Sequence, residues 1–177
     1  MSMSSTGIRP ITKLLVANRG EIAVRVLRTA KDMGLATVAV YSEADANAPH
    51  VQAADEAVCV GPAPSNESYL IIDRIVEAAL STGADAIHPG YGFLSENAEF
   101  AEAVEKAGIR FVGPHPHAIR VMGSKLAAKE AVAVRNIPMV PGTEGAVSDP
   151  AEAKREAERI GFPLSVSYTH LTLPTKA

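Results

Sequence analysis

The segment from His88 to Asn97 concentrates residue types that could do chemistry, reading His-Pro-Gly-Tyr-Gly-Phe-Leu-Ser-Glu-Asn. It places imidazole, phenol, hydroxyl, carboxylate and amide groups directly after a short apolar run, and such a loop is costly to order. The alternative is a tight connection in which the glycines supply special backbone angles while Phe93 and Leu94 fill the core. His88 taken alone is more often a hydrogen-bonded structural histidine than a base. The residue types leave both interpretations open.

A second candidate is Lys125, which follows Met122-Gly123-Ser124 at the predicted start of a helix. A positive charge is unfavourable there, because the backbone dipole at a helix start prefers a negative one. A bound phosphate would relieve this conflict. A solvated surface lysine is an equal explanation on charge alone.

The remaining reactive side chains give weaker signals. Cys59 lies in an apolar run, where we expect a buried core thiol. His115 and His117 have no Cys or carboxylate at ligand spacing, which argues against a metal site. The turn Asn18 to Gly20 lacks the spaced glycines of a dinucleotide-binding loop, which argues against a nicotinamide or flavin enzyme.

The elements that must position these residues alternate along the chain. Apolar and β-branched runs predict strands at residues 13–17, 37–41, 56–60, 84–88 and 109–112. Helical spacing predicts helices at residues 21–33, 69–81, 99–107, 118–122, 125–135 and 150–160, the last opened by Ser148-Asp149-Pro150. Strands separated by helices indicate an α/β fold with a parallel sheet flanked by helices on both faces. Ligands bind at the carboxyl ends of such strands, so the turn after the first strand and the His88 loop are the positions of interest.

The bulk composition excludes some partners. The chain has 177 residues, is 47% hydrophobic and 21% charged, and carries a net charge of -3. No long Lys/Arg cluster is present, which argues against nucleic acid or an anionic membrane as the main partner. The sequence shows neither a secretory signal nor a run of about 18 apolar residues, so we expect a cytoplasmic protein.

Several short segments together resemble the start of the biotin carboxylase family. In order, they are Ala-Asn-Arg-Gly-Glu-Ile-Ala at 17–23, Ala-Val-Tyr-Ser-Glu-Ala-Asp at 39–45, Ala-Asp-Glu-Ala-Val at 54–58, Gly-Pro-Ala-Pro-Ser at 61–65, the His88 loop, and Met-Gly-Ser-Lys at 122–125. Any one of them is a weak signal, but their order across residues 13–164 is specific.

The resemblance implies a Rossmann-like pre-ATP-grasp domain followed by the incomplete start of an ATP-grasp domain. On this basis we expect a disordered lead-in at 1–12, the biotin carboxylase N-terminal domain at 13–114, and the ATP-grasp start at 115–164. Lys125 matches a lysine that contacts nucleotide phosphate. The loop that faces the bicarbonate and biotin end of the active site matches His88, Gly90, Tyr91, Gly92, Phe93, Glu96 and Asn97. Arg25, Arg28 and Asp32 fall on the helix that the family uses near its dimer contact, although an exposed charged face explains them equally.

The reaction implied by the resemblance uses ATP, Mg²⁺, bicarbonate and biotin. ATP phosphorylates bicarbonate to an activated carbonate, and the carbon dioxide released from it is captured by a ureido nitrogen of biotin on a carrier protein. A biotin carboxyl carrier, a carboxyltransferase and a second copy of the chain are the implied partners. Most of the family's catalytic groups match no residue of this chain, so we expect the chain by itself to be inactive.

The resemblance stops after Gly161-Phe162-Pro163-Leu164. The family pattern continues with an apolar strand, Lys-Ala and a glycine-rich lid, whereas residues 165–177 contain no glycine and no lysine at the expected place. We therefore expect residues 165–177 to be a non-native tail.

Two other readings remain at this point. One is another ATP-grasp ligase, of the carbamoyl-phosphate or purine-synthesis type, although the full His88 loop favours the biotin enzymes. The other is a non-catalytic module that only dimerises or docks a carboxylase partner.

Overall fold

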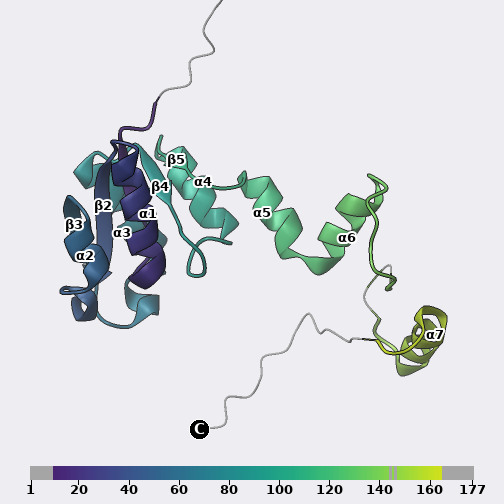
Figure 1. Ribbon diagram of the computed structural model, residues 1–177. Helices are drawn as coiled ribbons and strands as arrows, with labels where there is room; N and C mark the ends of the chain where they lie inside the picture. Colours follow the sequence, from purple (N-terminus) through teal and green to yellow (C-terminus); the bar gives the residue numbers. More distant parts are fainter. Residues whose placement is uncertain (1–9, 144, 146, 165–177) are drawn as a thin grey trace, which may run out of the picture. The chain divides into compact units, whose positions relative to one another are not determined.

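The structure is a computed structural model that describes residues 10–143, 145 and 147–164 (Figure 1). The chain divides into two compact units, Met1–Gly123 and Ser124–Ala177. The predicted tail at 165–177 and most of the predicted lead-in lie outside the described residues. The predicted domain limit after residue 114 stays a prediction. Among the described residues, no helix is both long and apolar enough to cross a membrane.

The first unit is built on a parallel sheet with strand order β3-β2-β1-β4-β5. The strands are β1 (Lys13–Val16), β2 (Ala36–Ser42), β3 (Glu56–Gly61), β4 (Ala86–His88) and β5 (Arg110–Phe111). The chain moves outward from β1 through β2 to β3, then crosses back to place β4 on the other side of β1. This reversal between β1 and β4 is the switch point at which open α/β sheets bind ligands. The predicted α/β fold with a parallel sheet is confirmed.

Helices cover both faces of this sheet, as Figure 1 shows. α1 (Gly20–Asp32) and the short α2 (Pro49–Ala53) lie on one face, where Ala23, Leu27 and Ala30 of α1 pack against β1. α3 (Ile72–Thr82) and α4 (Ala98–Lys106) lie on the other face with the larger apolar cluster. α5 (Pro116–Gly123) contacts α4 within the first unit. A sheet buried on both faces explains why its central strands read as continuous apolar runs.

Two local expectations differ from the structure. The helix predicted from Tyr69 begins only at Ile72, because Tyr69 is buried with its hydroxyl bonded to the carboxylate of Asp45. The segment predicted as a polar loop after β2 contains the short 3₁₀ helix η1 (Glu43–Asp45) and continues into α2. A second short 3₁₀ helix, η2 (Ser65–Glu67), precedes α3.

The prediction of a buried thiol at Cys59 is wrong. Cys59 is exposed, because β3 is an edge strand of the sheet. Its neighbours Val58 and Val60 point to the face covered by α3 and join the core. Successive side chains of a strand point to opposite faces, so Cys59 points to the face opposite to α3, where it is exposed on the edge strand.

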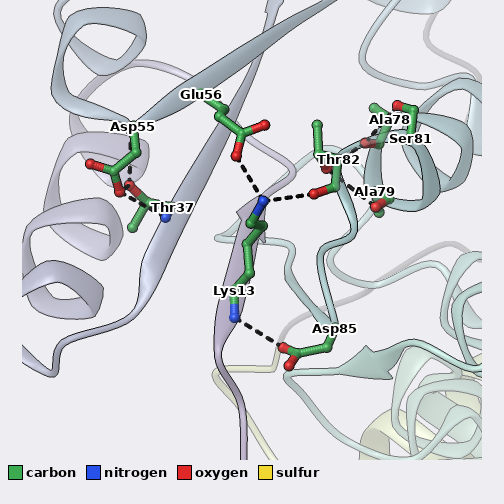
Figure 2. A network of polar contacts seen from close by, with 9 residues as sticks. All are labelled: Lys13, Thr37, Asp55, Glu56, Ala78, Ala79, Ser81, Thr82 and Asp85. Atoms are coloured by element: carbon green, nitrogen blue, oxygen red, sulfur yellow. Dashed lines mark hydrogen bonds and ion pairs between the residues drawn. The ribbon is translucent and has the colours of Figure 1, made fainter.

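The amino-terminal edge of the sheet is held by charged contacts (Figure 2). The ammonium of Lys13 donates to Glu56 Oε1 and to the Thr82 carbonyl, both at 2.7 Å, and its backbone N–H donates to Asp85. Close by, the hydroxyl of Thr12 donates to Asp85 at 2.7 Å. These bonds join the beginning of β1 to the beginnings of β3 and β4, at the opposite end of the sheet from the His88 loop.

Asp55 makes a similar bridge at the same edge. Its carboxylate accepts from the backbone N–H and the hydroxyl of Thr37 at 2.9 and 2.7 Å, and lies 2.8 Å from the ammonium of Lys31. The hydrogen bond from Lys31, followed by those from Thr37, lowers the pKa of Asp55 to about 2. The carboxylate is therefore ionised at neutral pH and joins β2 to the end of α1.

The second unit contains α6 (Lys125–Ala133) and α7 (Pro150–Ile160). The predicted start of α7 is confirmed, because the Asp149 carboxylate accepts from the N–H groups of Ala151 and Glu152 at 3.2 and 3.3 Å. Neither helix has a buried residue. These helices therefore gain little from apolar burial among the described residues of this chain.

Candidate functional site

The candidate site lies where β1 and β4 end side by side. Val16 pairs with His88 at the ends of the two strands, and the N–H of Ala17 donates to the His88 carbonyl at 2.9 Å. The turn after β1 and the loop after β4 therefore leave the sheet as neighbours. Both sequence-predicted positions of interest thus meet at one edge, as the parallel topology requires.

Asn18 joins these two loops. Its side-chain amide donates to the carbonyls of Pro89 and Tyr91 at 2.7 and 2.9 Å, and its Oδ1 accepts from the N–H of Arg19 at 2.9 Å. Asn18 is only 3% exposed, so water does not compete strongly for these bonds. The two carbonyls belong to the residues on either side of Gly90.

Gly90 permits this close approach. A Cβ at this position would lie 2.7 Å from Asn18 Nδ2, closer than side-chain atoms pack. Its φ of +66° lies in the left-handed region that favours glycine. Both constraints exclude other residues without rearrangement of the loop.

His88 has a structural role in this arrangement. Its Nδ1 accepts from the N–H of Gly90 at 2.9 Å, which places the ring hydrogen of the neutral form on Nε2. Burial lowers the pKa of His88, so the ring is neutral at neutral pH. This geometry supports the interpretation of His88 as a hydrogen-bonded histidine that shapes the loop.

Tyr91 is the side chain that the loop presents outward. It is 63% exposed, and its hydroxyl lies 3.4 Å from Glu21 Oε2 in the first turn of α1. The next part of the loop turns inward, because Leu94 is buried and Phe93 packs against the same apolar cluster. The loop therefore fills the core with one half and leaves a phenol exposed with the other.

Arg19 covers the inward half. Its guanidinium carbon lies 5.7 Å from the ring centroid of Tyr69 and 5.9 Å from that of Phe93. The two rings are stacked at 5.2 Å with an interplanar angle of 3°. A cation over aromatic faces is attracted to both rings, so Arg19 fastens Phe93 against the body of the domain.

Asp45 completes the polar part of this cluster. Its carboxylate accepts from the hydroxyls of Tyr69 and Ser42 at 2.6 and 3.0 Å, and it lies 3.3 Å from Arg19. Partial burial opposes ionisation of Asp45, but the bonds from Tyr69 and Ser42 and the charge of Arg19 hold its pKa below the usual range. Burial and the nearby carboxylate raise the pKa of Tyr69 to about 12. The cluster therefore carries a fixed ion pair at neutral pH.

The other predicted residues of the loop have distinct positions. Asn97 accepts from the N–H of Phe100 at 2.9 Å and so forms the N-cap of α4. Gly92 has a φ of +67° with open space around it, and Glu96 is exposed. Among the described residues, no hydrogen bond joins Gly92, Glu96 or Asn97 to Asn18 or Arg19.

The predicted dimer-contact residues lie along the outer side of α1. Arg25, Arg28 and Asp32 are all exposed. The two arginines line an open groove, together with Gly20, Glu21, Val24 and Pro49. The groove lies beside Tyr91, because Glu21 lines the groove and also lies 3.4 Å from the Tyr91 hydroxyl.

Lys125 is the first residue of α6, as predicted from the sequence, and its side chain is exposed. It belongs to the second compact unit, and its predicted contact with nucleotide phosphate stays a prediction. Among the residues described, no group of three or more His, Cys, Asp or Glu side chains could hold a metal ion.

The contacts of Asn18, Arg19, Asp45 and Tyr69 were not predicted from the sequence. For Asn18 and Arg19 a signal existed, because both directly follow the first strand at the ligand-binding edge. The contact between Asp45 and Tyr69 had no such signal, since it depends on how η1 and the segment before α3 pack together.

This sheet order, with its loops gathered at the switch point, defines a Rossmann-like α/β domain, a class in which ligands bind at the carboxyl ends of the strands. Residues 10–119 match the family described as biotin carboxylase, N-terminal domain. The chain belongs to the biotin carboxylase family. Its sheet and the helices that cover it form the pre-ATP-grasp domain of that family.

Curated relatives agree with this assignment. Over 157 residues the chain is 55% identical to the chloroplastic biotin carboxylase of Arabidopsis thaliana, covering 89% of this chain and 29% of the relative. It is 55% identical over 157 residues to the biotin carboxylase of Haemophilus influenzae, covering 88% of this chain and 35% of the relative. It is also 56% identical over 160 residues to the mitochondrial methylcrotonoyl-CoA carboxylase subunit alpha of Oryza sativa, of which it covers 22%. The chain thus spans a third or less of the length of most of these relatives.

Solved structures show the same fold. The biotin carboxylase domain dimer of the Hydrogenobacter thermophilus 2-oxoglutarate carboxylase, in complex with MgADP, ADP and bicarbonate, superposes with a TM-score of 0.80 at 51% identity. That match covers 86% of this chain and 34% of the other. The Campylobacter jejuni biotin carboxylase in complex with β,γ-ATP gives a TM-score of 0.82 at 47% identity, covering 87% of this chain and 34% of the other.

Proposed function

We propose that this chain supplies the N-terminal part of a biotin carboxylase, which uses ATP and bicarbonate to carboxylate biotin on a carrier protein. The observation that carries the proposal is the ordered His88 loop, fixed at the switch point by Asn18 with Tyr91 facing outward. The Hydrogenobacter domain, 51% identical, binds MgADP and bicarbonate in its crystal structure. That likeness supports bicarbonate and nucleotide as ligands of the complete protein.

In this proposal the loop shapes the bicarbonate and biotin end of the site and transfers no proton itself. His88 is neutral and its Nδ1 is occupied by the Gly90 N–H, so it is poorly placed as a base. Tyr91 offers a phenol edge and face for packing against a planar ligand. We expect the exposed ammonium of Lys125 to contact a nucleotide phosphate, which would also relieve its conflict with the start of α6.

Magnesium would neutralise the phosphates of the bound nucleotide. The described residues contain no suitable cluster of ligands for it, so no step through the metal is assigned to this chain. For the same reason we expect the purified chain by itself not to hydrolyse ATP. An ATPase signal that depends on bicarbonate and rises with biotin would contradict this expectation.

A hybrid enzyme tests the proposed function directly. Residues 10–119 of this chain replace the matching segment of the Haemophilus influenzae biotin carboxylase, whose sequence is 55% identical. We expect the hybrid to hydrolyse ATP in a manner that requires both bicarbonate and free biotin. A folded hybrid that lacks this activity, beside an active parent enzyme, would refute the proposal.

Two variants of the hybrid examine the role of Tyr91. Tyr91→Ala should raise KM for bicarbonate or biotin, because it removes the side chain that is proposed to shape this end of the site. Tyr91→Phe should leave the pH profile unchanged, because a shaping residue supplies no proton. A pH limb that disappears in Tyr91→Phe would show that the phenol itself titrates in the reaction.

We also propose that the exposed arginines of α1 contribute to a homodimer of the complete protein, as a Hydrogenobacter relative forms a domain dimer. The charge reversal Arg25→Glu with Arg28→Glu should shift the hybrid toward monomer in sedimentation velocity. An unchanged dimer would leave the alternative, a solvated charged face. A biotin carboxyl carrier and a carboxyltransferase are the further partners that the proposed reaction requires.

A further inference from the structure

All hydrogen bonds of the Asn18 side-chain amide are made within the two loops at the ends of β1 and β4. Both of its N–H groups donate to carbonyls of the His88 loop, at 2.7 Å to Pro89 and 2.9 Å to Tyr91. Its oxygen accepts from the next backbone N–H in the chain. With 3% of the residue exposed, no donor remains to contact a substrate.

The two bonds hold the backbone on both sides of Gly90. The absence of a side chain at Gly90 leaves room for the amide, since a Cβ there would lie 2.7 Å from Asn18 Nδ2 and 3.0 Å from its Cγ. The carbonyl of Tyr91 is thus fixed to the end of β1, which belongs to the centre of the sheet. Fixing that carbonyl limits the directions in which the Tyr91 side chain can point.

The neighbouring residue holds the other half of the loop. Phe93 has a φ of +44°, a conformation that a bulky side chain rarely adopts without support from its surroundings. Its ring is stacked on Tyr69 and lies beneath the Arg19 guanidinium. Consecutive residues after β1 therefore fasten the loop before and after its exposed tyrosine.

We propose that Asn18 is a positioning residue that sets the place of Tyr91 in the carboxylation site, with Arg19 as its second support. This inference rests on the proposed function, because it takes the Tyr91 loop to be part of that site. Asn18 itself touches no reacting atom. It acts through the backbone of the loop, where a misplacement of about 1 Å is enough to reduce a rate.

The substitution Asn18→Asp tests the inference with little change of shape. It keeps the oxygen that accepts from Arg19 but replaces both donors with an anionic oxygen that faces two carbonyls. Asn66→Asp makes the same chemical change at an exposed position in η2 and serves as the control. Both variants add one negative charge, so differences between them report the position of the change.

The first measurement is amide hydrogen exchange on the chain itself. The reporters are the N–H groups of Gly90, Ser95 and Asn97, each hydrogen-bonded within the loop. Asn18→Asp should accelerate exchange at Gly90 about tenfold, more than in the sheet, and Asn66→Asp should change nothing. Equal acceleration in loop and sheet, or none in the loop, would overturn the proposal.

A second substitution keeps the inference testable if Asn18→Asp does not fold. Arg19→Gln removes the cation above Phe93 and leaves the Asn18 amide in place. It should accelerate exchange at Ser95 and Asn97 more than at Gly90. A larger acceleration at Gly90 than at Ser95 and Asn97 would show that Asn18 and Arg19 do not hold separate halves of the loop.

The functional measurement uses the hybrid enzyme. Asn18→Asp should raise KM for bicarbonate or biotin at least tenfold while KM for ATP changes little, whereas a merely destabilised enzyme would lose active molecules at constant KM. If the hybrid is inactive without any substitution, the proposed function fails, and exchange in the chain still decides whether Asn18 holds the loop. If the hybrid is active and Asn18→Asp loosens the loop without changing KM or kcat, the positioning role fails alone.

Discussion

The pair Gly90 and Gly92 allows the packing of the His88 loop to be measured against an internal reference. Their φ angles are +66° and +67°, so an alanine at either position meets the same backbone penalty, about 1–2 kcal/mol. Their surroundings differ, because a Cβ at Gly92 would meet nothing within 4 Å. A Cβ at Gly90 would instead lie 2.7 Å from the amide nitrogen of Asn18.

The expected cost of Gly90→Ala follows from what Asn18 must give up. To make room, its amide has to move away from two carbonyls, and each lost bond is worth about 0.5–1.5 kcal/mol net. We therefore expect Gly92→Ala to cost about 1–2 kcal/mol and Gly90→Ala about 2–5 kcal/mol. The difference, about 2 kcal/mol, corresponds to roughly a thirtyfold change in the unfolding equilibrium.

The measurement is native-state hydrogen exchange at the amides of Leu15 and Ile87 in the central strands. These amides report the opening of the first unit alone, which matters in a chain with two compact units. In an Asn18→Ala background, the cost of Gly90→Ala should approach that of Gly92→Ala. Equal costs for the two glycines in the unsubstituted chain would refute the close packing of Asn18 against Gly90.

Three further predictions concern the rest of the first unit. Asp55 has a folded pKa of about 2, below its unfolded value of about 3.9, so it stabilises the fold above about pH 4 and loses this effect as the pH falls toward 2. Asp55→Asn should reduce the slope of unfolding free energy against pH in that window, and an unchanged slope in urea titrations would contradict the bond to Lys31. Cys59 should react with a chromogenic disulfide reagent in the native chain nearly as fast as in the unfolded one, and strong protection would contradict its exposure on the edge strand. Tyr69→Phe should cost about 1–3 kcal/mol in chemical denaturation, because it removes the 2.6 Å bond to the Asp45 carboxylate. A midpoint that does not move would show that this bond contributes nothing to stability.

The order of the elements could be predicted from local patterns in the sequence. Each strand and the main helices follow from runs and spacings within about a dozen residues. The start of α7 is likewise predicted by Asp149 and Pro150 alone, because the N-cap bond of Asp149 is local. Alternating strands and helices then imply a parallel sheet, and the rule for such sheets places the ligand edge after β1 and β4. The His88 loop could therefore be named as a candidate site from residue types and position alone.

Errors arose where burial depends on neighbours that are distant in sequence. Cys59 lies in an apolar run that resembles a buried strand, but the order of the strands puts β3 at the edge. Tyr69 continues a helical pattern in sequence, yet its hydroxyl is bound to Asp45 before α3 begins. In both cases the local sequence pattern does not show which distant segments the side chain will meet in the fold.

The sequence by itself determined the α/β class, the end of the sheet at which a ligand is expected, and the family, because these depend on periodicity, loop position and ordered motifs. Only the tertiary structure decided which residues hold the site together. The amide of Asn18 meets Pro89 and Tyr91 across more than 70 positions of the chain, with separations of 71 and 73 residues. Bonds of this kind exist only after β1 and β4 have paired, so no local pattern carries information about them.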